Sequence, residues 1–388
     1  MTATQADPMS VLRRRTSEKW RTCPADVLPM FVAEMDFPLA PPIRAVLQEA
    51  LAAGDTGYVD PRDRGAAEAF CSYAAEAWDW SPSPGRIRYT TDVSVVIVES
   101  LRRLIDPGDG VVITPPVYPP FFDLVPEAGG TVVEVPLLDD GRAWSLDLDG
   151  IDRALAAGAR AVLLCHPHNP VGLVHPRDTL VELSRIVERH GAVVVSDEIH
   201  APLTHRGTRF TPYLSVSEEA REHGIAAESG SKAFNLAGLK TAMFVAGSDR
   251  MAGLLRSLPA EVSVRTGLFG LLATRAGFAD GRPWLEDTLT AIEDNMGLLE
   301  QQLAEKLPAV GFRRPRATYL AWLDLSALGW GEDPAARALA HAGVALSSGP
   351  AFGAGGRGFA RMNLACAPET VVEAVDRLAR ASAGRAHR

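Results

Sequence analysis

Short apolar runs alternate with amphipathic stretches along the central part of the chain, from about residue 87 to 250. Helical spacing of apolar positions appears between most of these runs, at residues 95–105, 148–157 and 177–190. The runs that read as strands are residues 87–90, 110–114, 131–135, 161–165, 192–196 and 241–245. Such alternation is typical of a mostly parallel sheet that helices cover on both faces. The pattern therefore predicts an α/β fold, a three-layer α/β/α sandwich.

The two ends of the chain have a different pattern. An irregular arm is followed by an apolar run at residues 27–33, and a helix is predicted from Pro41 to Gly54. A long helical pattern at residues 284–307 leads into short strands and a closing helix at residues 368–382. We expect residues 1–50 to form an N-terminal arm and part of a small domain. Residues 51–285 would form the large domain, and residues 286–388 a smaller α+β domain.

Composition narrows the function classes. The 388 residues carry a net charge of −9, which argues against nucleic acid as a partner, because phosphate binding needs a basic face. The polar N-terminus lacks a signal peptide's apolar core, and no apolar run reaches membrane-spanning length, so a cytoplasmic protein without a membrane partner is expected. Its four cysteines lie far apart and have no metal-ligand spacing, which predicts no metal site.

Candidate chemistry lies after two of the predicted strands and after residues 224–228, a short segment that could itself be a strand. Lys232 follows two small hydroxyl residues, Ser229 and Ser231, which could bind a phosphate while the lysine holds a carbonyl cofactor as a Schiff base. Asn169 follows the strand that ends at residue 165, and Asp197 follows the strand at residues 192–196. The carboxyl ends of parallel strands share one edge of a sheet. We therefore expect these polar groups to face a common cleft.

These three residue types suit a pyridine aldehyde. A carboxylate such as Asp197 can keep the ring nitrogen protonated, so that the ring accepts electrons from the substrate Cα. The Asn169 amide can hydrogen-bond the phenolic oxygen, and the Lys232 amine can shuttle a proton once substrate displaces it. Taken singly, Asn169-Pro170 could be a turn and Asp197 a helix cap. Their joint order along the chain favours the cofactor.

The motifs resemble a known enzyme superfamily. The order Asn-Pro-x-Gly, Asp-Glu-Ile-His, Ser-x-Ser-Lys and a C-terminal arginine is similar to fold type I pyridoxal-phosphate enzymes, the aspartate aminotransferase superfamily. More narrowly, the chain resembles the cystathionine β-lyase (C-S β-lyase) branch over about residues 12–380. The motifs that carry this resemblance are residues 28–37, 116–121, 196–200, 232–239 and 319–324. The resemblance implies the PLP-dependent transferase-like fold and pyridoxal 5'-phosphate as the cofactor.

By position, the resemblance also implies further contacts with the cofactor. Tyr118 would stack its ring on the pyridine, although a tyrosine packed in the core is the alternative. The amides at Val95 and Val96, where a helix opens, would cradle the phosphate. Asp92 departs from the branch pattern there, and its charge would repel a phosphate, so either the side chain points away or the phosphate-binding segment lies a residue or two along the chain.

The remaining implied contacts come from scattered positions. Lys240 takes the place of a phosphate-binding arginine, and Tyr58 would reach the phosphate from the neighbouring subunit of a homodimer with shared active sites. Arg361 would bind the substrate carboxylate with two parallel hydrogen bonds, and Ala33 would lie beside the substrate. His200 would either orient Asp197 or touch the cofactor or substrate. Tyr58 could equally be an ordinary loop aromatic.

Three functions stay open at this stage. Branch resemblance favours a C-S β-lyase that acts on cystathionine or an S-conjugated cysteine and yields thiol, pyruvate and ammonia. An aminotransferase, or a tailoring enzyme that takes a cysteine conjugate through another aldimine fate, shares the same residues. A binding or regulatory protein is the third, but binding alone needs no proton shuttle. The residues do not identify the thioether.

Overall fold

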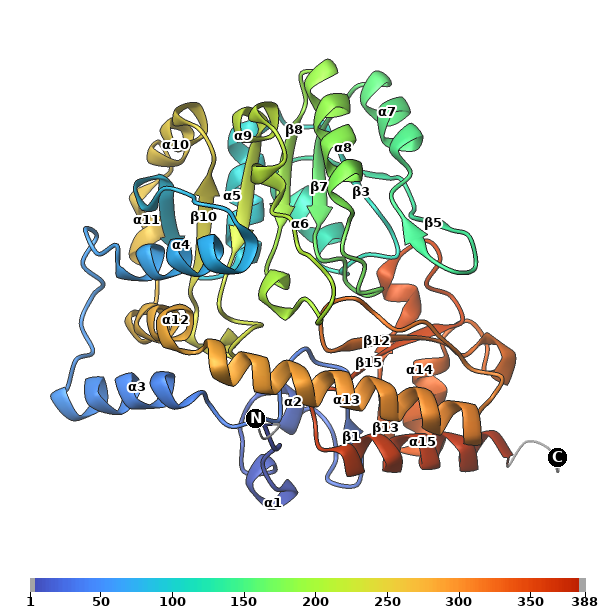
Figure 1. The fold of residues 1–388 in the computed structure, drawn as a ribbon. Helices are drawn as coiled ribbons and strands as arrows, with labels where there is room; N and C mark the ends of the chain where they lie inside the picture. Colours follow the sequence, from blue (N-terminus) through green and yellow to red (C-terminus); the bar gives the residue numbers. More distant parts are fainter. Residues whose placement is uncertain (1–3, 384–388) are drawn as a thin grey trace. The chain divides into compact units, whose positions relative to one another are not determined.

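The computed structural model describes residues 4–383, and the chain divides into two compact units (Figure 1). The large unit comprises Leu39–His168 and Leu173–Leu285. The small unit comprises Met1–Pro38, Asn169–Gly172 and Glu286–Arg388. Residues 39–50 thus group with the large unit, whereas the sequence prediction started that domain at residue 51. Within residues 4–383 no helix is both long enough and apolar enough to cross a membrane.

A seven-stranded sheet forms the centre of the large unit, in the order β2-β10-β9-β8-β7-β3-β4. Only β10 runs against its neighbours, so the predicted mostly parallel sheet is confirmed. The strands are β2 (Ile87–Thr90), β3 (Gly110–Ile113), β4 (Thr131–Glu134), β7 (Ala159–Cys165), β8 (Val193–Asp197), β9 (Gly224–Glu228) and β10 (Ala242–Ala246). A separate hairpin pairs β5 (Leu138–Asp139) with β6 (Trp144–Ser145).

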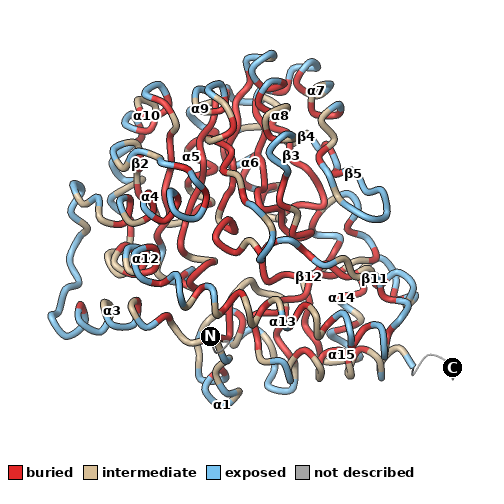
Figure 2. Tube along the Cα trace, viewed as in Figure 1, coloured by how far each residue is buried: buried red, intermediate tan, exposed pale blue. Residues whose placement is uncertain are grey.

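Helices on both faces bury the central strands of the sheet. Every residue of β8, β9 and β10 is buried, as the red strands of Figure 2 show. Helix α5 packs on these three strands through an apolar face that includes Val96, Ile97 and Leu101. The helices of the large unit are α3 (Pro41–Ala53), α4 (Gly65–Trp78), α5 (Val93–Leu104), α6 (Phe121–Glu127), α7 (Leu148–Ala156), α8 (Arg177–Arg189), α9 (Glu218–His223), α10 (Asp249–Arg256), α11 (Ala260–Val264) and α12 (Leu268–Asp280).

The small unit is built on an antiparallel sheet in the order β11-β12-β15-β14. Its strands are β11 (Gly311–Phe312), β12 (Leu320–Asp324), β14 (Ser347–Ser348) and β15 (Phe359–Asn363), and β1 (Leu28–Pro29) pairs with β13 (Val344–Ala345). Its helices are α1 (Met9–Leu12), α2 (Glu18–Arg21), most of α13 (Arg282–Lys306), α14 (Pro334–Arg337) and α15 (Pro368–Ala383). The N-terminal arm is thereby tied to strands that are formed more than 300 residues later.

Candidate active site

Asp197 is the last residue of β8 and is buried between the neighbouring strands β7 and β9. Its Oδ1 atom accepts a hydrogen bond from the backbone N–H of Ile199 at 3.2 Å. Burial raises the pKa of the Asp197 carboxyl to about 7, while the hydrogen bond and the charge of Lys232 act in the opposite direction. The large unit therefore holds an acid that would gain stability from a cationic partner.

Lys232 lies in the turn that directly follows β9, the strand next to Asp197. Ser229 shapes this turn: its Oγ donates to the carbonyl of Thr241 at 2.7 Å and accepts the N–H of Ser231 at 3.0 Å. The side chain of Lys232 is half-buried and interacts electrostatically with Asp197. The structure thus brings together the predicted lysine, acid and two serines at adjoining strand ends.

The N-terminus of α5 is already capped by the chain's own acid. Asp92 precedes the helix, and its Oδ1 accepts the N–H of Val95 at 3.1 Å. The N–H of Val96 donates to the Asp92 carbonyl at 3.2 Å. The exposed Lys240 ammonium lies 3.4 Å from Asp92 Oδ2. The amides predicted to cradle a phosphate are therefore engaged, and Asp92 is turned into the helix end, where an aspartate is a favoured cap.

Three other predicted residues differ in their surroundings. Tyr118 is half-buried against the large core cluster, with its ring edge-on to Phe121 at a centroid distance of 6.0 Å. His200 is buried just after β8. Tyr58 is 92% exposed on the segment between α3 and α4. Of the three side chains, that of Tyr58 is the least buried by the rest of the chain.

These residues fit pyridoxal 5'-phosphate. The test is Asp197, a fully buried carboxyl whose pKa burial has raised, because a protonated ring nitrogen is the kind of partner that would stabilise its ionised form. Lys232 in the adjacent turn supplies the amine that a Schiff base requires. The half-buried ring of Tyr118 offers an aromatic face.

In the small unit, Arg361 is held in one orientation. One terminal nitrogen donates to Asn169 Oδ1 at 2.9 Å, and the other donates to the Phe31 carbonyl at 3.0 Å and to Ser347 Oγ at 3.1 Å. The guanidinium also lies over the ring of Phe352, with its carbon 5.1 Å from the ring centroid. Such a fixed guanidinium is suited to bind a carboxylate without a further loss of side-chain entropy.

The Asn169–Gly172 segment is shaped by its final glycine. Gly172 has φ +64, and a side chain there would overlap Pro315 and the Ala317 carbonyl. The segment can therefore lie against residues 315–317 only with glycine at this position. Asn169 is buried and reaches Arg361 from this segment. The predicted neighbour Ala33 lies in the same unit, where its carbonyl accepts the Tyr319 hydroxyl at 2.9 Å.

A cluster of buried histidines in the large unit was not predicted. Nε2 of His166, His168 and His175 lies 3.0–3.1 Å from a backbone carbonyl oxygen. Burial lowers the pKa of all three rings, to about 3 for His168 and about 4 for His175. The rings are therefore neutral N–H donors that fix the chain just before Asn169. Among residues 4–383, no group of three or more possible ligands could hold a metal ion.

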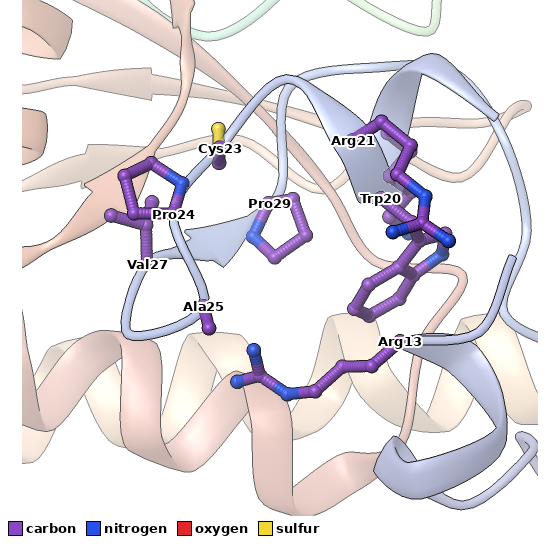
Figure 3. Close-up of a pocket in the computed structure, with 9 residues that line it drawn as sticks. Arg13, Trp20, Arg21, Cys23, Pro24, Ala25, Val27 and Pro29 are labelled. Carbon is purple, nitrogen blue, oxygen red and sulfur yellow. The ribbon is translucent and has the colours of Figure 1, made fainter. Parts of the chain in front are cut away.

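A cavity of about 220 Å³ lies in the N-terminal part of the small unit (Figure 3). Figure 3 shows Arg13 extending toward Ala25, with the Trp20 indole between Arg13 and Arg21. The residues that line the cavity are Arg13, Lys19, Trp20, Arg21, Cys23, Pro24, Ala25, Val27 and Pro29. None of them is among the predicted site residues, so this cavity is separate from the chemistry considered above.

Comparison with known proteins identifies the family of the chain. Residues 39–378 match the aminotransferase class I and II family, and the chain belongs to that family. It has the fold type I architecture of PLP-dependent transferases.

Two relatives and one solved structure illustrate the likeness. The chain is 34% identical to cystathionine beta-lyase PatB of Bacillus subtilis (strain 168), over 91% of this chain and 92% of that protein. It is 32% identical to a cystathionine beta-lyase of Corynebacterium glutamicum, over 95% and 97% of the two chains. The structure of cystalysin from Treponema denticola, which contains pyridoxal 5'-phosphate, superposes with a TM-score of 0.91 at 26% identity, covering 96% of this chain and 97% of that one.

Proposed function

We propose that this protein is a PLP-dependent C-S β-lyase that cleaves cystathionine or an S-conjugated cysteine into thiol, pyruvate and ammonia. The observation that carries the proposal is the pairing of a buried acid, Asp197, with Lys232 at adjoining strand ends of one sheet. Binding alone would need neither an amine that moves protons nor an acid held in low dielectric. The names of the relatives favour the lyase reaction within the family.

The chain's own residues divide the chemistry between them. When bound, pyridoxal phosphate supplies an electron sink for the charge that develops at the substrate Cα. The Lys232 amine is placed to remove the Cα proton, and the Asp197 carboxylate to keep a proton on the ring nitrogen. The Asn169 amide and the Tyr118 ring are proposed to orient the ring.

Arg361 is proposed to fix the substrate by its α-carboxylate. Its guanidinium is held by Asn169, Phe31 and Ser347, so binding a carboxylate requires little reorganisation. Lys240, the α5 N-terminus at Val95 and Val96, and the serines of the Lys232 turn are proposed phosphate contacts. For Val95 this contact requires the phosphate to displace the Asp92 carboxylate from the helix end. We also propose the remaining substrate and cofactor contacts, by Ala33 and His200.

A product assay tests the reaction. Purified protein loaded with pyridoxal phosphate is mixed with cystathionine or an S-alkyl cysteine, and thiol, pyruvate and ammonia are followed with and without a keto-acid acceptor. Equal amounts of thiol and pyruvate without an acceptor are expected. The family also includes aminotransferases, such as the aspartate/prephenate aminotransferase of Thermus thermophilus, 27% identical to this chain. Turnover that needs the acceptor would replace the lyase by an aminotransferase.

We further propose a cytoplasmic homodimer with shared active sites. The 92% exposed Tyr58 supports this, because it is available to reach the phosphate of a second copy. Mixed dimers formed from Tyr58→Ala and Lys232→Ala subunits provide the test. If Tyr58 acts across the interface, mixing the two inactive proteins restores up to one native site per mixed dimer. Activity that stays at the level of the parents would show that each site uses its own Tyr58.

A further inference from the structure

Two buried carboxyl groups that the proposed reaction does not use lie behind Asp197, at the ends of neighbouring strands. Glu228 ends β9, and Glu198 follows the last residue of β8. In the parallel register Asp197 pairs with Ala227, and the Glu198 N–H donates to the Ala227 carbonyl at 3.0 Å. Because side chains alternate along strands, Glu198 and Glu228 share the face opposite to Asp197. Both residues are completely buried.

The hydrogen-bond partners of the two carboxyls are unequal. Oε1 of Glu198 accepts from the Ser196 hydroxyl at 2.8 Å and from the Tyr213 N–H at 2.9 Å. Among residues 4–383, no donor reaches Oε2 of Glu198 or either oxygen of Glu228. The two carboxyls lie on one face at adjacent positions of neighbouring strands, close enough for each to shift the pKa of the other. If both were ionised, they would repel and leave three acceptors unpaired, a costly state in a buried site.

One proton removes both problems. A protonated Glu228 would donate to Oε2 of Glu198, while the two donors on Oε1 stabilise the ionised form of Glu198. Burial raises the pKa of Glu198 to about 7 and that of Glu228 well above its usual value. The neighbouring carboxyls Glu198 and Asp197 raise the pKa of Glu228 further. The proton therefore belongs on Glu228 at neutral pH.

Among residues 4–383, no lysine, arginine or histidine forms an ion pair with either glutamate. Strand β8 contributes Asp197 and Ser196, and β10 places Met243 opposite Glu228. The short helix at Tyr213–Ser215 contributes a backbone amide, while the Tyr213 hydroxyl is bonded to His223 of α9 at 2.8 Å. Lys232, beyond β9, acts on Asp197. A proton shared by the two glutamates is therefore what reduces their combined negative charge.

We propose that Glu198 and Glu228 share one proton and that the resulting hydrogen bond clamps the end of β8 to the end of β9. The clamp positions Asp197, which precedes Glu198, relative to the Lys232 turn, which follows Glu228. Both glutamates are thus positioning residues, not groups that touch substrate. The shared proton is a property of the apo protein and does not depend on the proposed function. Its effect on turnover does rest on the proposed function.

Infrared spectroscopy of the apo protein tests the shared proton directly. A protonated carboxyl has a C=O stretch that a carboxylate lacks, and we expect the wild type to show one at neutral pH that Glu228→Gln removes. Glu134→Gln is the matched control, because Glu134 ends β4 of the same sheet but is exposed. If the wild-type and Glu228→Gln spectra are the same in this region, the shared proton is disproved.

The pH dependence of unfolding gives a second readout. A carboxyl whose folded pKa is raised binds more protons when folded, so its contribution to stability falls as pH rises from the unfolded to the folded pKa. Glu228→Gln keeps a donor for Glu198 but cannot ionise. We expect its midpoint of chemical unfolding to fall less steeply between about pH 5 and pH 8 than that of the wild type. Equal slopes in the two proteins would contradict the proposal.

Positioning is tested separately, on cofactor-loaded protein. Glu228→Leu removes the hydrogen bond and should lower kcat by about tenfold to a hundredfold, with a smaller change in KM, because misplaced reacting groups lose rate. Glu228→Gln should restore most of kcat, and its pH profile should lack the alkaline decline that we expect for the wild type. A leucine variant with wild-type kcat would overturn the positioning role. Failure of the lyase assay would leave the infrared and unfolding results intact.

Discussion

The buried charged groups of the two units differ in the partners that surround them. In the small unit, Lys19 and Asp36 form a buried ion pair at 2.8 Å, and Arg361 is bonded to three oxygen acceptors. In the large unit, the carboxyls of Asp197, Glu198 and Glu228 are gathered at two strand ends, and their pKa values are raised. In the small unit Lys19 thus has a carboxylate partner and Arg361 has neutral acceptors, whereas the large unit gathers three acids beside Lys232. Perturbed groups of this kind concentrate where chemistry is done.

Replacing Lys232, the lysine beside the three buried acids, should have the largest effect on activity. Lys232→Ala leaves no amine to remove the Cα proton, so kcat should fall by at least about 10³-fold. Thiol release from the cofactor-loaded protein measures this. Lys306→Ala, which removes a lysine of the small unit, is the control and should retain activity. Turnover by Lys232→Ala within tenfold of the wild type would place the proton transfer elsewhere.

Breaking the compensated pair of the small unit should mainly affect stability. Lys19→Met leaves the buried Asp36 carboxyl unpaired, and the free energy of unfolding should fall by about 3–5 kcal/mol. Chemical denaturation monitored by tryptophan fluorescence measures the loss, and Lys19→Met/Asp36→Leu should recover much of it. Arg62→Met removes an exposed partner of Asp60 and should change stability by less than about 1 kcal/mol. A similar loss in both single variants would remove the contrast.

Changing the geometry of the Arg361 guanidinium should affect substrate binding. Arg361→Lys keeps the charge but loses the planar fork, so KM should rise by about tenfold to a hundredfold with a smaller change in kcat. Arg361→Ala should weaken binding further. Arg357→Lys, on an exposed pair with Glu332, is the matched control. An unchanged kcat/KM in Arg361→Lys would show that the substrate carboxylate binds elsewhere.

The smallest expected change per measured step, about 1 kcal/mol for each pH unit, concerns the pH dependence of the apo protein. Burial raises the pKa of Asp197 from 3.8 to about 7, so the folded state binds its proton more tightly than the unfolded state does. Apo stability should therefore fall as pH rises from about 4 to 7, by up to about 1 kcal/mol per pH unit from this group. Asp197→Asn should reduce that slope, and the exposed Asp249→Asn should not. A slope that is the same in all three proteins would contradict the raised pKa.

The sequence predicts the sheet well because its strands are buried on both faces. β7 and β8 contain apolar runs at residues 161–165 and 193–195, and the polar Asn169 and Asp197 follow these runs as expected. The sequence could also have predicted that Asp92 caps α5, since an aspartate before a helix is a familiar N-cap. The sequence pattern alone showed only that its charge conflicts with a phosphate.

Other features depend on register and could not be read from the chain. Glu198 and Glu228 face each other only because Asp197 pairs with Ala227, and the sequence does not state which residues of two strands align. Lys19 lies on the four-residue helix α2 and Asp36 on an irregular segment 17 residues away, so no periodicity of the sequence pairs them. The histidine cluster combines His166 and His168 with His175, which approaches from beyond the Asn169–Gly172 segment.

The interleaving of the two units has a consequence for biosynthesis. The Phe31 carbonyl can accept its hydrogen bond from Arg361 only after a further 330 residues have been translated. In the same way, β1 can pair only after β13 has been synthesised. Neither unit is a continuous fragment of the gene. A truncated chain that stops before β13 would leave β1 without its strand partner and Asn169 without its guanidinium. Early termination near the end of the message should therefore yield a product for proteolysis, even though the whole seven-stranded sheet has already been translated.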